Sequence, residues 1–99
     1  MINLNKIANR ALLSALRRGK VEMTEDFNKL HCNLKALYEE VEEVKEASEF
    51  KKSSHIEATE IEEELVDVLI SCMTELSLRG ANVEALIKAK LEFNEKRKD

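Results

Sequence analysis

The sequence predicts an all-α protein with a single domain over residues 1–99. The chain has 99 residues, of which 43% are apolar, and this length and composition suit one domain with one core. It contains only 2 glycines and no proline, so it lacks the turn residues that a sheet protein needs. Apolar residues recur at spacings of three and four, which is the helical period. We therefore expect a four-helix chain that forms a helical bundle.

The first two expected helices have recognisable ends. The first is expected over about residues 4–18, because Gly19 suits a left-handed helix stop. The second is expected over about residues 24–50, with Thr24 as its N-terminal cap. Its apolar residues follow the helical spacing and form one stripe, which predicts a buried face. The stripe consists of Phe27, Leu30, Leu34, Leu37, Val41 and Val44.

The last two helices follow a short turn. The third is expected over about residues 55–79, because the Ser-x-x-Glu pattern at residues 54–57 matches a capping box and Gly80 suits a stop. The fourth is expected over about residues 83–97, with Asn82 as its cap.

The apolar character of the third helix predicts self-association. From Leu65 to Met73 it is apolar nearly all round, so it should be buried on most sides. Four short helices in one chain offer too little cover for such a helix. We therefore expect a homodimer, or a dimer of dimers, that completes the bundle.

Carboxylates interrupt the apolar faces of the second and third helices. Glu39, Glu40 and Glu43 lie beside small apolar residues on the second helix. On the third helix, Asp67 interrupts the apolar run and shares one stripe with Glu64. Carboxylates are rarely buried without a partner, because desolvating one unpaired costs several kcal/mol. These positions therefore predict a positively charged ligand.

The expected hairpin brings these acids to one height. A turn at residues 51–53 makes the two helices antiparallel, so that Glu40 faces Glu64 and Glu43 faces Glu60. Oxygen ligands of this kind favour a hard divalent cation, Mg²⁺ above all, with Mn²⁺ as the second candidate.

Other metal chemistries fit the sequence less well. A zinc site is not expected, because Cys32 and Cys72 stand apart and no paired His or Cys spacing is present. A di-iron bundle needs Glu-x-x-His pairs, and neither His31 nor His55 has a Glu three residues before it.

The charges are segregated along the chain. Residues 1–20 carry five bases and no acid, whereas residues 39–67 carry twelve acids and three bases. This pattern favours a metal-bound polyanion as ligand rather than direct binding to nucleic acid. Some of the acids are assigned to solvated helix faces. These are Glu46, Glu49, Glu62 and Glu63.

The sequence shows no signal peptide and no apolar run of transmembrane length. We therefore expect a cytoplasmic protein that makes no membrane contact and whose two thiols are free.

Three short motifs occur in a fixed order. Residues 39–43 read E-E-x-x-E, residues 64–67 read E-x-x-D, and residues 90–97 read K-x-x-x-N-x-x-R. Together they resemble the motifs of the MazG-like all-α nucleoside triphosphate pyrophosphohydrolases. The chain departs from that family at Ala36, where a Lys is frequent, and at Glu42, where a Gly is frequent.

The resemblance implies Mg²⁺-dependent cleavage of a nucleoside triphosphate between its α and β phosphates. The implied metal ligands are Glu39, Glu40, Glu43 and Asp67. Glu64 would be a further ligand or would orient the attacking water. The implied substrate contacts, which share one face of the fourth helix, are Lys90, Asn94 and Arg97.

Two other functions remain open at this point. One is a non-enzymatic dimerisation or adaptor module whose acidic face binds a basic partner. The other is phosphoribosyl-ATP pyrophosphohydrolase, which belongs to the same superfamily. The chain has no Trp for base stacking, so its nucleobase preference is undetermined.

Overall fold

The computed structural model describes residues 2–98, and its fold is all-α. Four helices follow one another along the chain: α1 (Leu4–Arg17), α2 (Phe27–Glu46), α3 (Glu60–Leu78) and α4 (Val83–Lys96). Outside the helices, the described residues contain one isolated β-bridge, between Lys52 and Thr59. The predicted fold class and the four helices are confirmed.

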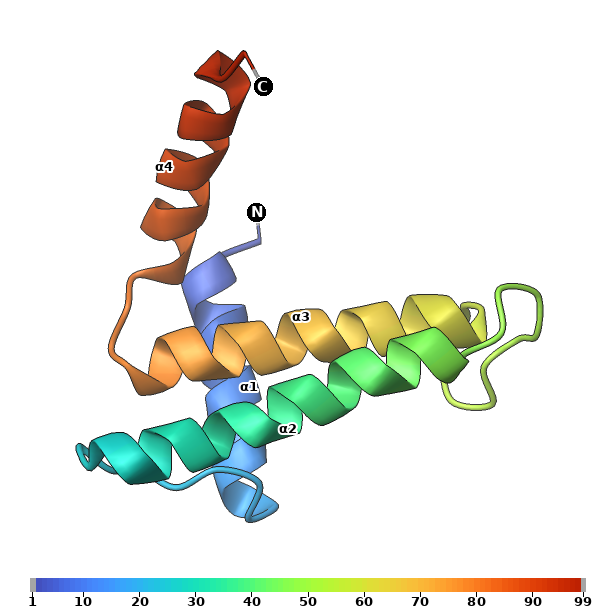
Figure 1. Ribbon diagram of the computed structural model, residues 1–99, viewed down its shortest axis with the longest axis horizontal. Helices are drawn as coiled ribbons and strands as arrows, with labels where there is room; N and C mark the ends of the chain where they lie inside the picture. The colour runs from blue at the N-terminus through green and yellow to red at the C-terminus, as the bar shows by residue number, and fades with distance from the viewer. Residues whose placement is uncertain (1, 99) are drawn as a thin grey trace.

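The helices form a hairpin, a crossing helix and an arm (Figure 1). Helices α2 and α3 lie side by side and run in opposite directions, and α1 crosses α3. Helix α4 leaves the C-terminal end of α3 and projects from the body. Within residues 2–98, α2 packs on α3 and on no other helix. The core is small: Ala8, Met73 and Val83 pack together where α1, α3 and α4 meet.

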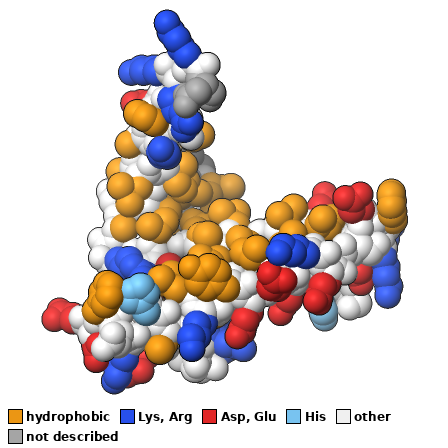
Figure 2. All heavy atoms as spheres, in the orientation of Figure 1, with side chains coloured by type: hydrophobic (Ala, Val, Ile, Leu, Met, Phe, Trp, Pro, Cys, Tyr) orange, Lys and Arg blue, Asp and Glu red, His pale blue; other side chains and the backbone are white. Residues whose placement is uncertain are grey.

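Much apolar surface stays exposed around this core. Leu65, Val66, Leu69 and Ile70 are exposed, so much of the stretch predicted to be buried on most sides is uncovered in the single chain, whereas Met73 at its end lies in the core. Figure 2 shows hydrophobic side chains along α4 and across the corner where α4 meets the body. We call the exposed apolar residues of α3 and α4 the apolar corner. They are Leu65, Val66, Leu69, Ile70, Leu86, Leu91 and Phe93.

The stops of α1 and α3 are made by the two glycines. After α1, Gly19 has a φ of 70°, its N–H donates to the Leu16 carbonyl at 3.1 Å, and the Lys20 N–H donates to the Ala15 carbonyl at 2.8 Å. Gly80 ends α3 in the same way, with a φ of 73°. These are Schellman motifs, in which a residue in the left-handed region is needed and glycine carries no steric penalty. Both predicted stops are confirmed.

Helix α2 is shorter than the predicted range of about 24–50. It starts after Asp26, whose Oδ1 accepts the Asn28 N–H at 2.9 Å, so the cap predicted at Thr24 is wrong. The Thr24 hydroxyl oxygen instead accepts the Asp26 N–H at 2.9 Å, just before the helix. The helix ends early because the backbone at Ala47 is extended.

The predicted start of α3 is also wrong. Thr59 and Glu62 form the capping box, and the Ser-x-x-Glu pattern at residues 54–57 belongs to the loop. The Thr59 hydroxyl oxygen accepts the Glu62 N–H at 3.3 Å, and Glu62 Oε1 accepts the Thr59 N–H at 2.9 Å. The connection therefore spans residues 47–59 rather than a short turn at 51–53.

Replacing Thr59 with alanine is expected to lower the free energy of unfolding by about 1 kcal/mol, the usual cost of losing an N-cap. Urea unfolding followed by circular dichroism measures it. Ser54→Ala is the matched control, because Ser54 is exposed and caps no helix, and its expected effect is close to zero. Equal losses in the two variants would contradict the observed start of α3.

The structure agrees with two free thiols and contains no helix that could span a membrane within residues 2–98. Cys32 and Cys72 are free. Burial, with a smaller contribution from the charge of Glu75, raises the pKa of the Cys72 thiol, which disfavours its reactive thiolate. Within residues 2–98, no helix combines the length and the apolar character needed to cross a bilayer.

Candidate metal centre

The hairpin brings three carboxylates together. Glu40 and Glu43 lie on α2 and Glu64 lies on α3, and one oxygen of each is within 4.8 Å of the other two. Ligand oxygens around one Mg²⁺ ion lie about 3 to 4 Å apart, because Mg–O bonds are about 2.1 Å long. We call this set the three-carboxylate group.

The acids of the two motifs meet across the hairpin. Glu40 lies near Glu64, as predicted, and Glu43 interacts with Glu64 as well. Glu60 lies nearer the loop, where its Oε1 accepts the Ser48 N–H at 3.3 Å. Glu64 therefore has two acids of α2 beside it rather than the single predicted one.

Two oxygens of the group have no partner. Oε2 of Glu40 and Oε2 of Glu64 are buried and accept no hydrogen bond from the described residues. No Lys, Arg or His within residues 2–98 forms an ion pair with either residue. A buried carboxylate oxygen without a partner costs free energy, so such atoms are rare in folded proteins. The group therefore fits a hard divalent cation bound by oxygen.

Burial, together with the neighbouring carboxylates, raises the pKa values of these acids. Burial, followed by the charge of Glu43, raises the pKa of Glu40 above its ordinary value of 4.5. Burial and a hydrogen bond with Glu43 raise the pKa of Glu64. Burial and the charge of Glu63 raise the pKa of Asp67 above 3.8. A bound cation would favour the charged forms and reverse these shifts.

The metal-free protein is expected to become more stable as the pH falls from neutrality. The pKa values of Glu40, Glu64 and Asp67 are higher in the folded than in the unfolded chain. Their stabilising contribution is complete below the unfolded values, near 4, and is lost as the pH rises through the folded values. Glu62 does not oppose this, because its pKa is lowered by the Thr59 hydrogen bonds and it titrates below 4.5.

Urea unfolding in EDTA between about pH 5 and pH 8 measures this dependence. With Mg²⁺ present the trend should reverse, because the ion competes with protons for the same oxygens. A free energy of unfolding that rises with pH in EDTA would contradict the crowding of these acids.

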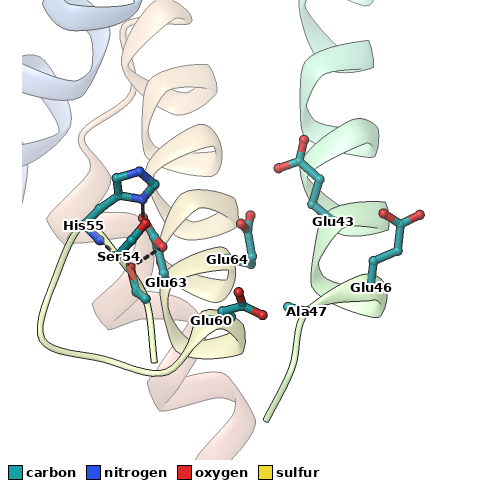
Figure 3. A pocket seen from close by; sticks show the side chains of 9 residues that line it. Glu43, Glu46, Ala47, Ser54, His55, Glu60, Glu63 and Glu64 are labelled. Carbon is teal, nitrogen blue, oxygen red and sulfur yellow. Dashed lines mark hydrogen bonds and ion pairs between the residues drawn. The ribbon is translucent and has the colours of Figure 1, made fainter. Parts of the chain in front are cut away.

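An open pocket of about 300 Å³ adjoins the three-carboxylate group at the loop end of the hairpin (Figure 3). Glu43, Glu60 and Glu64 line it, and His55 is its only lining residue that can carry a positive charge. Glu63 connects α3 to the loop that precedes it. Its Oε1 accepts a hydrogen bond from the Ser53 hydroxyl at 2.6 Å, and its Oε2 lies 3.1 Å from His55 Nδ1. The surplus of acids favours cations here.

Two predicted ligands lie outside the three-carboxylate group. Asp67 is close to it, because its charge contributes to the raised pKa values of Glu40 and Glu64. Glu39 is exposed and shares no three-residue cluster with the other acids within residues 2–98. The structure thus places Asp67 beside the group and Glu39 at the surface.

The residues predicted to contact substrate lie at the outer end of α4, and Arg97 is the C-cap of that helix. Lys90, Asn94 and Arg97 are exposed, and the two cations lie near the Phe93 ring: Lys90 Nζ is 4.5 Å and the Arg97 guanidinium carbon 5.9 Å from the ring centre. Helix α4 follows the C-terminal end of α3, whereas the acids lie toward its N-terminal end (Figure 1). One chain therefore does not bring the third motif to the acids of the first two.

Sequence reasoning missed two sets of residues near the acids. Glu63 is partly buried and binds the loop, so its assignment to a solvated face is wrong. The sequence does contain a signal for Glu63: it lies three residues after Glu60 and four before Asp67, and such steps place residues on one helix face. Arg18 and Lys20, which follow α1, also lie close to the hairpin. No pattern in the nearby sequence predicts this contact.

Comparison of the chain with protein-family models, with curated proteins and with solved structures finds no match. The fold and the site define an all-α helical-hairpin protein with a candidate divalent-cation centre. The resemblance to MazG-like pyrophosphohydrolases rests on the three motifs alone.

Proposed function

We propose that this protein is a Mg²⁺-dependent nucleoside triphosphate pyrophosphohydrolase that yields a nucleoside monophosphate and pyrophosphate. The observation that carries the proposal is the pair of buried, unpartnered oxygens on Glu40 and Glu64, next to Glu43. These residues belong to the E-E-x-x-E and E-x-x-D motifs, so motif and geometry point to the same atoms.

Each acid has a role that its surroundings support. Glu40, Glu43 and Glu64 would hold Mg²⁺, or Mn²⁺ in its place. When bound, the ion neutralises the triphosphate charge and polarises the phosphorus under attack. Asp67 adjoins the group, so its carboxylate would be placed to accept a proton from the attacking water. Glu39, which is exposed, would act from the surface.

The proposed active form is a homodimer, or a dimer of dimers. The chain exposes 7866 Å² of accessible surface, whereas a compact monomer of 11.4 kDa exposes about 5,800 Å². The excess is about 2,000 Å² per chain, which is what obligate homodimers bury. The apolar corner supplies the exposed hydrophobic residues that such an interface needs (Figure 2).

Dimerisation would also give the third motif a role. Helix α4 projects away from the acids of its own chain, so Lys90 and Asn94 are better placed to reach the site of a second copy. Basic and amide groups there would contact phosphate or ribose. The free thiols and a nucleotide substrate agree with the cytoplasm, which is the compartment we propose.

A substrate panel tests the function. Purified protein with Mg²⁺ is expected to release pyrophosphate as the first product from at least one nucleoside triphosphate, and EDTA should stop the release. The panel includes standard and modified nucleotides and phosphoribosyl-ATP. Orthophosphate as the first product, or no turnover on any member, would contradict the proposal. If, in addition, Mg²⁺ left the melting temperature unchanged, the adaptor function would be favoured.

A further inference from the structure

A second pocket adjoins the hairpin on the other side of the three-carboxylate group. It has a volume of about 80 Å³, and its lining includes Glu40 and Ser71 of the hairpin together with Arg18 and Lys20, which follow α1. The pocket at the loop end has no Lys or Arg in its lining. The three-carboxylate group therefore borders both pockets: Glu43 and Glu64 line the acidic one, and Glu40 lines the one with two basic residues.

The Schellman motif at the end of α1 places the two basic residues. The Arg18 N–H donates to the Ser14 carbonyl at 3.0 Å, and its Nε–H donates to the same oxygen at 3.4 Å. The Lys20 N–H is held by the Ala15 carbonyl at 2.8 Å, and Gly19 between them turns the chain. Both residues are thus fixed at the backbone while their side chains stay exposed.

Neither basic side chain is used in an ion pair. Within residues 2–98, Arg18 and Lys20 have no carboxylate within 4 Å. Glu75, the second acid that lines the pocket, is already paired with Arg79 at 2.6 Å. The Arg18 charge nevertheless acts on Asp67, where it opposes the rise in pKa that burial causes. The two cations are therefore close to the acids but available to an anion.

We propose that Arg18 and Lys20 bind phosphate oxygens of the substrate, so that the triphosphate lies between the three-carboxylate group and the end of α1. This inference rests on the proposed function. The acids would repel a triphosphate wherever the ion does not screen them, so basic groups on the open side are needed. A guanidinium can donate to two phosphate oxygens at once, and an ammonium adds a point charge.

Isothermal titration of the whole protein with inorganic tripolyphosphate in Mg²⁺ tests the inference, with Arg18→Gln, Lys20→Gln and the double variant. Each single variant should weaken binding about tenfold and the double variant about a hundredfold, as expected for charge-assisted hydrogen bonds. The KM for the nucleotide should rise in parallel with little change in kcat. Arg18→Lys should recover part of the loss. Arg17→Gln is the matched control, because Arg17 is the neighbouring base and lines neither pocket.

The outcomes separate this inference from the proposed function. If the wild type turns over its substrate but Arg18→Gln and Lys20→Gln bind tripolyphosphate as tightly as the wild type, the inference alone is overturned. An equal loss in Arg17→Gln would show a general charge effect and would also overturn it. A lower melting temperature of metal-free Arg18→Gln would assign Arg18 to charge balance in the fold. Wild-type protein that neither binds tripolyphosphate nor turns over would overturn both proposals.

Discussion

Replacing Glu43 with glutamine is expected to lower kcat/KM for pyrophosphate release by more than about a hundredfold, since even residues that only support a metal ligand account for 10 to 100-fold. Glu43 interacts with both Glu40 and Glu64, so its loss removes the centre of the three-carboxylate group. The same change should leave the metal-free protein as stable as before, or more stable, because it relieves repulsion between like charges. Asp67→Asn should behave in the same way.

Thermal melts in EDTA and in Mg²⁺, alongside the pyrophosphate assay, decide this prediction. Mg²⁺ should raise the melting temperature of the wild type, and Glu43→Gln should reduce that rise. Glu42→Gln is the matched control, because Glu42 is exposed and pairs with Lys45 at the surface. A large loss of metal-free stability in Glu43→Gln would indicate a structural ion pair. Loss of activity in Glu39→Gln would show that the ligand set includes the surface acid that the motif implies.

Introducing a charge into the apolar corner is expected to separate the subunits. Leu69 is 55% exposed in the single chain and lies in the middle of the exposed stretch of α3. Burying a glutamate without a partner costs several kcal/mol, which is a large part of the stability of a dimer. Leu69→Glu should therefore convert a wild-type dimer or tetramer into a monomer, with a strong loss of activity.

Light scattering at micromolar concentration measures the oligomeric state. Met23→Glu is the matched control, because Met23 is also exposed but lies in the loop between α1 and α2, outside the apolar corner. A stable and active wild-type monomer would contradict the proposed dimer. Dissociation by both variants would show that the interface is not confined to the apolar corner.

The sequence by itself determined the features that depend on neighbours along the chain. The helical period alone predicts that Glu40 and Glu43 share one face of a helix, and this holds in α2. Gly19 and Gly80 end their helices as predicted, because a left-handed residue at a helix stop is a local requirement. The all-α class follows from the same kind of information.

The sequence offers two possible starts for α3. Ser54 and Thr59 are both followed three residues later by Glu, so either could begin a capping box. The choice depends on contacts between the loop and the hairpin: the Ile61 N–H donates to the Ser48 carbonyl at 3.1 Å. The start at Thr59 lengthens the connection between the helices to residues 47–59.

Only the tertiary structure decided which charged groups meet. Glu43 interacts with Glu64 because the length of the connection sets the register of α2 against α3, and no residue within either helix carries that information. Arg18 approaches Glu40 because α1 crosses α3 and stops beside the hairpin. Helix α4 leaves from the far end of α3, so the third motif stays away from the acids of its own chain. Such contacts join residues distant in sequence, and the packing of whole helices determines them.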